Sequence, residues 1–538
     1  MSTDTPRRLA MNAGETDASF RQQSVGDLLV EVAKRAPERT ALIVPASPDN
    51  TERRWTYAEL RSTAEGVARA LLGRFNPGDR VATWAGGSAE IVMLQLGAAL
   101  AGIVLVTINP ANRAVELEYT LAKSRARGLF LDRVYRGMDN AGIWNEIRGR
   151  LPDLDTAIYF DEWNDFTASV KPVPLPQVDP EAPALILFTS GSSGQPKAAV
   201  LRHAGIVNNA ALTARHLAIP DGQVWLNLLP MFHVGGSVTM TLGCMATAGT
   251  QVLQAQFSAD AVLDAVAQHR PFMTMAVPTM LVALLESPKL AATDMASLEL
   301  IVAGGSAVAP DLIRRVKAEM GAEVASLMGQ TEASGAMLST RRDDDAERVS
   351  NSVGGPLALS EVKIADTSAG HTLAIGEIGE ICVRSRCTMS GYFEMPDKTA
   401  EALREDGWLH TGDLGLMRPD GYVQVTGRSS DMIIRGGENI YPREIEDVLV
   451  EHPAVALAAV FGVPDERWGE QVAAALVARP GQAIDTVALT VWLQTRIARH
   501  RIPKFWRVVD ALPVNLSGKV QKFVLQAEFD QAKRRFDN

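Results

Sequence analysis

The sequence predicts an α/β protein with a large amino-terminal domain of several layers and a small α+β carboxyl-terminal domain. Its 538 residues exceed the roughly 150 residues of a typical domain several-fold. Short β-like runs alternate with longer helical segments over most of the chain, as parallel strands joined by crossover helices require. After about Asp413 the segments become short and turn signals become frequent. We therefore expect two domains, residues 1–428 and residues 429–538.

The first predicted element is an amphipathic helix over residues 22–37. Ser24 is a good capping residue, and Asp27 stands three positions later, where an acidic side chain can bond back to the cap. The spacing of the apolar residues indicates that one face of this helix lies in the core. That face comprises Val25, Leu28, Leu29 and Val32.

The next segments show the alternation most clearly. Residues 81–84 have the pattern of a strand, and residues 90–101 that of a buried helix, which runs through Gly102 into a strand over 103–107. Further strands beside helical segments are expected at 184–188, 251–253 and 298–303.

Two later segments complete the prediction. The charged run Arg341–Arg348 is expected to be a solvated loop. In the carboxyl-terminal domain, residues 441–452 are expected to be helical and to precede a strand over residues 455–460.

Composition excludes several classes of protein. Hydrophobic residues at 46% and charged residues at 22% are ordinary globular values, so the chain is not disordered, collagen-like or a coiled coil. A net charge of -10 argues against general attraction to nucleic acid. The three cysteines are too few and too poorly spaced for a disulfide framework or a zinc site, which favours a reducing compartment. They are Cys244, Cys382 and Cys387.

No segment has the pattern of a membrane span. The amino terminus lacks the apolar centre of a secretory signal. The longest apolar stretch, residues 91–106, is interrupted by Gln95 and falls short of the roughly 20 residues that cross a bilayer. We expect a cytoplasmic protein without an integral membrane span.

The strongest local motif follows the predicted strand at 184–188. Glycines let the backbone approach an anion, hydroxyls and N–H groups donate to its oxygens, and a lysine adds positive charge. The spacing is not that of a P-loop, because Gly191 and Gly194 are too close and Ala198 follows the lysine. A plain turn would explain the glycines but not the whole set. The set is Thr189, Ser190, Gly191, Ser192, Ser193, Gly194 and Lys197.

This motif resembles the phosphate-binding signature of the adenylate-forming superfamily, which includes acyl-CoA synthetases, peptide-synthetase adenylation domains and luciferases. Six further segments resemble that family's signatures and follow in its order, which chance would not reproduce. In chain order the segments are Thr189–Lys197, Gly304–Ser306, Met328–Glu332, Thr411–Asp413, Gly427–Arg428, Arg435–Glu446 and Leu512–Lys519.

The resemblance implies that a carboxylate attacks the α-phosphate of ATP, so that pyrophosphate leaves and an acyl-adenylate forms. Two anions then meet, and fixed donors and cations must offset their repulsion. By resemblance, Thr331 contacts the α-phosphate, and Glu332 holds Mg²⁺, a hard cation that suits a carboxylate. Asp413 accepts from the ribose hydroxyls, assisted by Arg428. The other expected nucleotide residues are Thr189–Gly194 and Lys197 at the β- and γ-phosphates, Gly304, Gly305 and Ser306 near adenine, and Met328, Gly329 and Gln330.

Lys519 is the residue expected to catalyse the first step. Its cation, between the attacking carboxylate and the α-phosphate, would stabilise charge that develops in the transition state. A solvated surface lysine is the alternative, because Lys522 lies nearby in the sequence, but the Ser-Gly-Lys setting favours catalysis.

In the family the small domain is mobile: it rotates about a hinge after adenylation and presents another face to the thiol of coenzyme A. Arg435, Gly436 and Gly437 resemble the segment that borders the pantetheine tunnel. Two positions depart from the family pattern. Ser430 stands at the hinge, where many relatives carry Asp or Lys, and Met328 stands where an aromatic residue usually lies against adenine. AMP is then released with the acyl-CoA product.

The acid is expected to be uncharged beyond its carboxylate. Peptide-synthetase domains carry Asp where His233 stands, so an amino acid is disfavoured, and the resemblance makes His233 a wall or gate of the acyl pocket rather than a base. A hydrophobic slot gains roughly 0.8 kcal/mol per buried methylene, which favours a medium- or long-chain fatty acid. The pocket set is His233, Val234, Gly235, Gly236, Val277, Pro278, Thr279, Ala303, Gly304, Gly329 and Ala333.

Alternatives remain open for the acid and the acceptor. Aryl and alicyclic acid–CoA ligases share every motif used above, and an acyl-AMP ligase would load a carrier protein instead of coenzyme A. Only a short tail follows Lys519 in the sequence, so we expect no fused carrier domain and free coenzyme A as acceptor. A noncatalytic nucleotide-binding protein is a weaker alternative, because the expected catalytic residues are retained. A homodimer is an expectation from the family alone.

Overall fold

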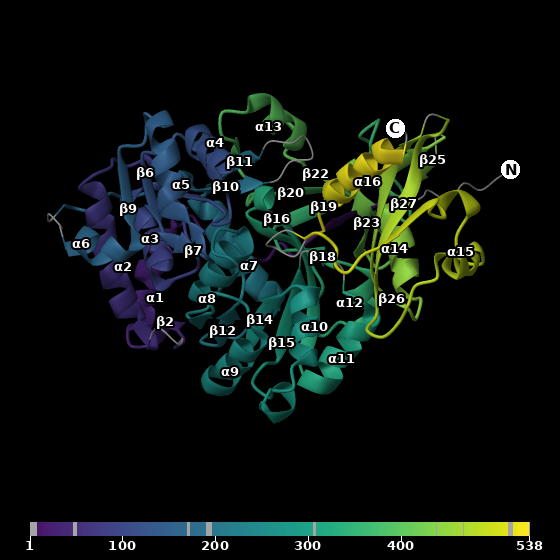
Figure 1. The fold of residues 1–538 in the computed structure, drawn as a ribbon. Helices are drawn as coiled ribbons and strands as arrows, with labels where there is room; N and C mark the ends of the chain where they lie inside the picture. The colour runs from purple at the N-terminus through teal and green to yellow at the C-terminus, as the bar shows by residue number, and fades with distance from the viewer. Residues whose placement is uncertain are drawn as a thin grey trace. The chain divides into compact units, whose positions relative to one another are not determined.

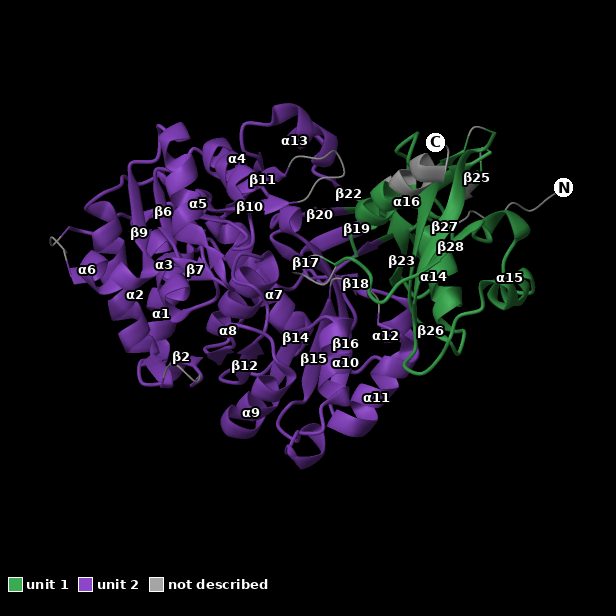
Figure 2. Cartoon of the chain, in the orientation of Figure 1, with its two compact units in different colours: residues 1–11, 363–382, 411–538 green, residues 12–362, 383–410 purple. Residues whose placement is uncertain are grey.

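A computed structural model of the chain (Figure 1) describes residues 8–46, 51–168, 173–189, 196–304, 308–436, 438–465, 467–514 and 520–536. The chain forms two compact units, which Figure 2 colours separately. Unit 2 comprises residues 12–362 and 383–410, and unit 1 comprises residues 1–11, 363–382 and 411–538. The predicted division at residues 428 and 429 stays a prediction.

A seven-stranded sheet forms one half of unit 2, with the strand order β21-β11-β10-β5-β4-β6-β9. The five strands from β10 to β9 in that order run parallel, as predicted, whereas β11 pairs antiparallel with both β10 and β21. The strands are β4 (Arg80–Trp84), β5 (Val104–Thr107), β6 (Gly128–Leu131), β9 (Thr156–Tyr159), β10 (Pro183–Thr189), β11 (Lys197–Arg202) and β21 (Gly391–Tyr392).

A nine-stranded sheet forms the other half of unit 2, with the order β18-β17-β16-β15-β14-β12-β13-β2-β3. Its central strands, from β16 to β2, are parallel, and the strands at its margins pair antiparallel. The strands are β2 (Thr40–Val44), β3 (Arg53–Thr56), β12 (Val224–Asn227), β13 (Thr250–Leu253), β14 (Met273–Ala276), β15 (Leu300–Gly304), β16 (Glu323–Gln330), β17 (Gly335–Ser339) and β18 (Gly355–Pro356).

Helices fill the space between these sheets and cover their outer faces, which gives five layers (Figure 1). The inner layer contains α1 (Val25–Arg35), α2 (Tyr57–Leu72), α3 (Ala89–Ala101), α7 (His203–His216) and α8 (Thr241–Ala246). The outer face of the seven-stranded sheet carries α4 (Ala114–Ser124) and α5 (Asn140–Ile147). The outer face of the nine-stranded sheet carries α9 (Ala259–His269), α10 (Pro278–Glu286) and α11 (Pro310–Met320).

Local sequence signals account for two helices. The predicted cap of α1 is confirmed, because the Asp27 N–H donates to Ser24 Oγ at 3.1 Å and the Ser24 N–H donates to Asp27 Oδ2 at 3.0 Å. Helix α3 ends where Gly102 takes a left-handed conformation, with φ of 67°, and leads into β5. Glycine is favoured there because a side chain would strain that backbone.

The prediction of a loop at Arg341–Arg348 is wrong for its last three residues, 346–348, which are helical. Helix α12 (Ala346–Asn351) begins inside the charged run, where Asp345 caps it by accepting from the Arg348 N–H at 2.8 Å. Val349 is buried in the core beside α11, and this burial holds the short helix in place.

Unit 1 contains a sheet of order β25-β24-β27-β26, and β28 pairs with β27. Helix α14 (Pro442–Val450) precedes β26, as predicted for residues 441–460. The other elements are β24 (Ile433–Arg435), β25 (Glu438–Ile440), β26 (Val455–Asp465), β27 (Gly469–Ala478), β28 (Phe505–Val508), α15 (Thr486–Gln494) and α16 (Lys522–Phe536). Within the described part of the chain, every helix is too short or too polar to cross a membrane.

A third sheet has the order β1-β19-β20-β22-β23. Its strands are β1 (Met11–Ala13), β19 (Ser360–Ala365), β20 (Gly379–Ser385), β22 (Leu409–Met417) and β23 (Val423–Arg428). The β22–β23 hairpin matters for function, because it sets Asp413 opposite Arg428. The remaining helices are α6 (Trp163–Ala168) and α13 (Pro396–Ala402).

His203, the first residue of α7, is a buried titratable group in the inner layer. The Val25 N–H donates to its Nδ1 at 3.4 Å, and its Nε2 has no hydrogen-bond partner among the described residues. Burial lowers the pKa of His203 to about 4, although Asp27 and Asp179 oppose the shift. The ring is therefore neutral in the folded protein at neutral pH.

We expect this histidine to make the protein less stable in mild acid. In the unfolded chain the His203 ring takes up a proton near pH 6.5, whereas in the folded protein it does so only near pH 4. The free energy of unfolding is therefore unaffected by this group above pH 6.5 and falls as the pH drops from 6.5 to 4. The loss from His203 between pH 7 and pH 5 is about 2 kcal/mol. Urea unfolding at pH 7 and at pH 5 measures this loss, and the loss in His203→Asn should be smaller than that in wild type by about 2 kcal/mol. Equal losses in the two proteins would show that His203 is not the cause.

Candidate active site

The predicted motifs of unit 2 meet at one edge of the nine-stranded sheet. Strands β12, β14, β15 and β16 are adjacent and parallel, so their carboxyl ends lie side by side. Residues 229–236 and 277–279 follow β12 and β14, whereas Gly304 and residues 328–330 are the last residues of β15 and β16. Ligands of open α/β sheets bind at such an edge. The structure therefore brings together signature segments that are far apart in the sequence.

A short turn after β16 carries Thr331 and Glu332 in the 3₁₀ helix η5 (Thr331–Ala333). The turn closes through Ser334, with φ of 64°, and Gly335, with φ of 136°. Thr331 is buried, and Glu332 is half-buried. The two residues are thus held at the end of the sheet edge by a tight backbone reversal.

Asn209 of α7 holds this turn in place. Its side-chain amide donates to the carbonyl oxygens of Ala333 at 3.2 Å and of Ala336 at 2.7 Å, and its Oδ1 accepts from the Ala336 N–H at 3.0 Å. Asn209 is buried, so these bonds satisfy groups that water does not reach. Sequence reasoning did not identify Asn209; its signal was a pair of asparagines in an otherwise apolar helical segment.

The phosphate-binding motif reaches the same turn. Thr189, the last residue of β10, donates from Oγ1 to Glu332 Oε1 at 3.2 Å. Lys197, the first residue of β11, pairs with Thr189 across the two strands. The segments Thr189–Lys197 and Met328–Glu332 are therefore in direct contact through Thr189 and Glu332.

Tyr392 of β21 also contacts this group, and sequence reasoning missed it. Its hydroxyl donates to Glu332 Oε1 at 2.7 Å, and Lys197 Nζ lies 4.5 Å from the centre of its ring. No local pattern marks this tyrosine, because its contacts depend on the pairing of β21 with β11.

His233 lies in the loop after β12. Its Nδ1 accepts from the Gly235 N–H at 3.2 Å, which leaves the proton of the neutral ring on Nε2. His233 is exposed, yet desolvation by the surrounding protein lowers the pKa of its ring, which is therefore mostly neutral at pH 7. Gly236 follows at a close approach of backbones, where an added Cβ would lie 2.4 Å from the Pro230 oxygen.

The predicted acyl-pocket residues differ in exposure. Six of them are exposed or half-buried, and five are buried. The accessible residues are His233, Val277, Pro278, Thr279, Gly304 and Gly329, and the buried ones are Val234, Gly235, Gly236, Ala303 and Ala333.

In unit 1, Asp413 and Arg428 form an ion pair on the β22–β23 hairpin. Arg428 Nε lies 3.1 Å from Asp413 Oδ1, and the Asp413 side chain is only 12% exposed. The Asp413 N–H donates to Thr411 Oγ1 at 3.1 Å. The ion pair with Arg428 therefore holds the Asp413 carboxylate.

A second arrangement in unit 1 involves Arg435 and Gly436. Arg435 Nε donates to Gln471 Oε1 at 2.8 Å, and its guanidinium carbon lies 4.8 Å from the centre of the Trp468 ring. Gly436 has φ of 61°, and a Cβ there would lie 2.7 Å from that ring. Glycine is therefore required for both its conformation and its contact with Trp468.

Several predicted site residues lie outside the described part of the chain. They are Ser190, Gly191, Ser192, Ser193, Gly194, Gly305, Ser306, Gly437 and Lys519. Met328 is described: it is buried in β16 and pairs with Leu338 of β17. Gln330 ends the same strand, beside Thr331.

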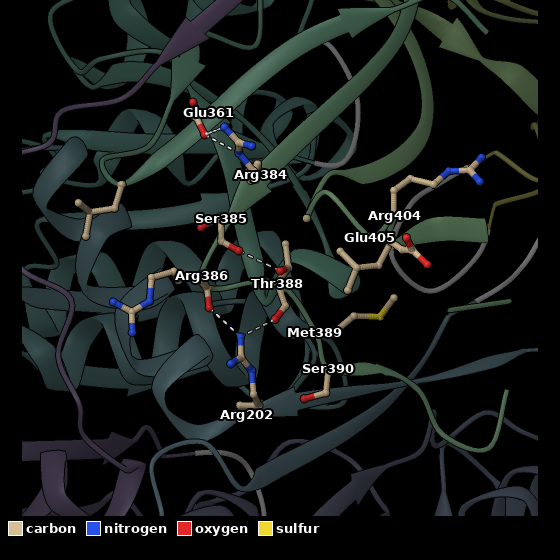
Figure 3. A pocket seen from close by; sticks show the side chains of 13 residues that line it. Arg202, Glu361, Arg384, Ser385, Arg386, Thr388, Met389, Ser390, Arg404 and Glu405 are labelled. Carbon is tan, nitrogen blue, oxygen red and sulfur yellow. Dashed lines mark hydrogen bonds and ion pairs between the residues drawn. The ribbon is translucent and has the colours of Figure 1, made fainter. Parts of the chain in front are cut away.

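Figure 3 shows a cavity of about 600 Å³ in unit 2. Two of its arginines are already held. Arg384 Nε donates to Glu361 at 2.6 Å, and an Arg202 Nη donates to the carbonyl oxygens of Arg386 at 2.8 Å and Thr388 at 3.1 Å. The predicted site residues do not line this cavity, and we assign it no ligand.

Comparisons with known proteins show the family of the chain. Residues 29–393 match the model of the AMP-binding enzyme family, and residues 444–519 match that of the AMP-binding enzyme C-terminal domain. The medium-chain acyl-CoA ligase ACSF2 of mouse mitochondria (Mus musculus) is 33% identical to this chain, and the match covers 96% of this chain and 89% of that protein.

Two solved structures share the fold. ATP-bound MatB from Rhodopseudomonas palustris has a TM-score of 0.86 and 29% identity, over 94% of this chain and 99% of that one. The o-succinylbenzoate CoA synthetase MenE from Bacillus subtilis, in complex with its acyl-adenylate intermediate, has a TM-score of 0.81 and 30% identity, over 94% and 98% of the two chains. The chain therefore belongs to the AMP-binding enzyme family of the adenylate-forming superfamily. Within that family it is an AMP-forming acyl-CoA synthetase.

Proposed function

We propose that the protein joins a medium- or long-chain fatty acid to coenzyme A at the expense of ATP. In the first step, a carboxylate oxygen bonds to the α-phosphorus and pyrophosphate leaves. In the second, the thiol sulfur bonds to the acyl carbon, AMP leaves, and the thiol proton passes to water. The contact between Thr189 and Glu332 is the main support, because it joins the triphosphate motif to the turn that carries Thr331.

The residues of unit 2 suit the triphosphate and its cation. Lys197 supplies positive charge next to Thr189, and Thr331, in the turn after β16, is the proposed contact of the α-phosphate. Glu332 offers a carboxylate, the hard oxygen ligand that Mg²⁺ prefers. Bound Mg²⁺ would offset the negative charge of the phosphates as pyrophosphate leaves. We assign this site to Glu332.

The nucleoside and the thiol have separate proposed sites in unit 1. The Asp413 carboxylate, held by Arg428, accepts from the ribose hydroxyls. Arg435 and Gly436, packed on Trp468, border the path of the pantetheine arm of coenzyme A. The catalytic role in adenylation is assigned to Lys519 by family resemblance.

The proposed acyl pocket is uncharged. Its accessible side chains are aliphatic or small, and His233 is a neutral donor through Nε2, which suits a wall residue rather than a base. The name of the mouse relative supports a medium-length aliphatic acid. The relation to an o-succinylbenzoate ligase supports an aromatic acid as the second candidate. A cytoplasmic location and a homodimer both remain proposals.

A panel of acids tests the substrate proposal. Straight-chain acids from butanoate to octadecanoate, together with benzoate, would each be assayed for kcat/KM with ATP and coenzyme A. We expect kcat/KM to rise about threefold to fourfold per added methylene until the pocket is full, because each buried methylene gains roughly 0.8 kcal/mol. A higher kcat/KM for benzoate than for every fatty acid would favour the aryl ligase instead.

Asn209 provides a test of the turn that carries Thr331 and Glu332. Asn209→Ala should lower kcat about tenfold to a hundredfold, because misplaced catalytic groups lose orientation. Asn208 is the matched control, since it is equally buried in α7 but bonds to Arg21 and Ala204 instead. Both variants should lose about 1–3 kcal/mol of stability. The kcat values are compared at a temperature at which both variants are folded. If the changes at Asn208 and Asn209 lower kcat equally, Asn209 does not position the turn that carries Thr331 and Glu332.

A further inference from the structure

Two hydroxyl donors converge on one oxygen of Glu332. The Tyr392 hydroxyl lies 2.7 Å and the Thr189 hydroxyl 3.2 Å from Oε1. A carboxylate with one oxygen held in this way has a fixed orientation. Its second oxygen, Oε2, then points in a direction that the protein determines.

The ring of the same tyrosine faces a cation. Lys197 Nζ lies 4.5 Å from the centre of the Tyr392 ring, within the range in which the electron-rich face of an aromatic ring attracts an ammonium group. Lys197 and Ala199 point to the same side of β11, and Ala199 is the partner of Tyr392 in the neighbouring strand. One side chain thus contacts both Glu332 and Lys197.

The backbone around Tyr392 is anchored on both sides. The Tyr392 N–H donates to Thr399 Oγ1 at 2.9 Å, and the Met389 N–H donates to the Glu332 carbonyl oxygen at 2.8 Å. Gly391 has φ of 145°, and a Cβ there would lie 2.8 Å from Thr399. Tyr392 itself is 5% exposed. A buried side chain on an anchored backbone can act as a rigid support.

We propose that Tyr392 is a positioning residue, which presents Oε2 of Glu332 to Mg²⁺ and holds Lys197 for the triphosphate. The inference rests on the proposed function, since it assumes those roles of Glu332 and Lys197. Removal of the Tyr392 hydroxyl should weaken the binding of the metal ion, whereas removal of the whole ring should also weaken the binding of ATP.

Two replacements of Tyr392 separate its contact with Glu332 from its contact with Lys197. Both are made in the full-length protein, and the carboxylic acid substrate is left out so that no turnover occurs. Mn²⁺ binding in the presence of ATP would be followed by electron paramagnetic resonance, and metal-free ATP binding by calorimetry. Tyr392→Phe should weaken Mn²⁺ binding about tenfold, as loss of a partner of a metal ligand does, and leave metal-free ATP binding unchanged. Tyr392→Leu should in addition weaken metal-free ATP binding about fivefold, because the contact of the ring with Lys197 is lost.

Two controls make the outcomes distinguishable. Tyr57→Phe removes another buried phenol bond of unit 2, from Tyr57 to the Gly249 oxygen at 2.7 Å, and should change neither affinity. Glu332→Gln should weaken Mn²⁺ binding more than Tyr392→Phe does. If Glu332→Gln weakens Mn²⁺ binding but Tyr392→Phe does not, the positioning role is wrong and the metal assignment stands. If Glu332→Gln has no effect on Mn²⁺ binding, the metal assignment fails, and the role of Tyr392 fails with it.

Discussion

Lys519→Ala should lower the rate of acyl-adenylate formation about a hundredfold or more, which is the usual effect of removing one preorganised charge from a transition state. The attacking carboxylate and the α-phosphate are both anions, and their repulsion rises as they approach. A cation between them stabilises the transition state more than the bound substrates, so kcat falls while ATP affinity stays nearly the same. Acid-dependent exchange of labelled pyrophosphate into ATP measures this step directly.

The matched control for Lys519 is Lys522, which begins α16 and pairs with Glu446 at 2.7 Å. Lys522→Ala removes a positive charge three residues from Lys519 in the sequence, together with one half-buried ion pair. Because this lysine has no proposed contact with the reacting groups, the exchange rate should stay within about twofold of wild type. An unchanged exchange rate in Lys519→Ala would refute the catalytic assignment. If Lys519→Ala and Lys522→Ala lower the exchange rate equally, the loss of one positive charge matters and not the position of Lys519.

Asp413→Ala should raise the KM for ATP about a hundredfold. The carboxylate is proposed to accept two hydrogen bonds from the ribose, and hydrogen bonds to charged groups contribute about 1.5–3 kcal/mol each. The variant should also lose its preference for ATP over 2′-deoxy-ATP, because the group that recognises the hydroxyl is gone. The ratio of kcat/KM for the two nucleotides measures this loss.

Asp420→Ala is the control on the same hairpin. Asp420 lies 3.4 Å from Arg418 in the turn between β22 and β23, so its removal breaks an ion pair of the hairpin without touching the proposed ribose site. Its KM for ATP should match that of wild type. If Asp413→Ala still discriminates against 2′-deoxy-ATP as wild type does, the ribose assignment is wrong.

Elements with local determinants were predictable from the sequence. The cap of α1 depends on Ser24 and Asp27, three residues apart, and the reversal after α3 depends on Gly102 alone. The helix that begins at Ala346, inside the charged run 341–348, was not predictable, because it depends on the burial of Val349 beside α11, which a charge pattern does not reveal. Local signals therefore predict helix ends better than they predict packing.

The candidate site also combines features that local sequence signals reveal with contacts that they do not reveal. Signature residues such as Thr189 and Glu332 were identified by sequence, but their contact joins positions 143 residues apart. Tyr392 lies 60 residues from Glu332, and Asn209 lies 127 from Ala336, so only the pairing of strands and the packing of α7 reveal what they hold. Residues that support a site through distant contacts leave little trace in one sequence.

The most direct test of the central claim separates the two half-reactions. With Mg-ATP and a fatty acid but no coenzyme A, labelled pyrophosphate should exchange into ATP while little AMP accumulates. Adding coenzyme A should then release AMP and acyl-CoA in equal amounts. Release of ADP, or AMP release at full rate without coenzyme A, would contradict an acyl-CoA synthetase that works through an acyl-adenylate.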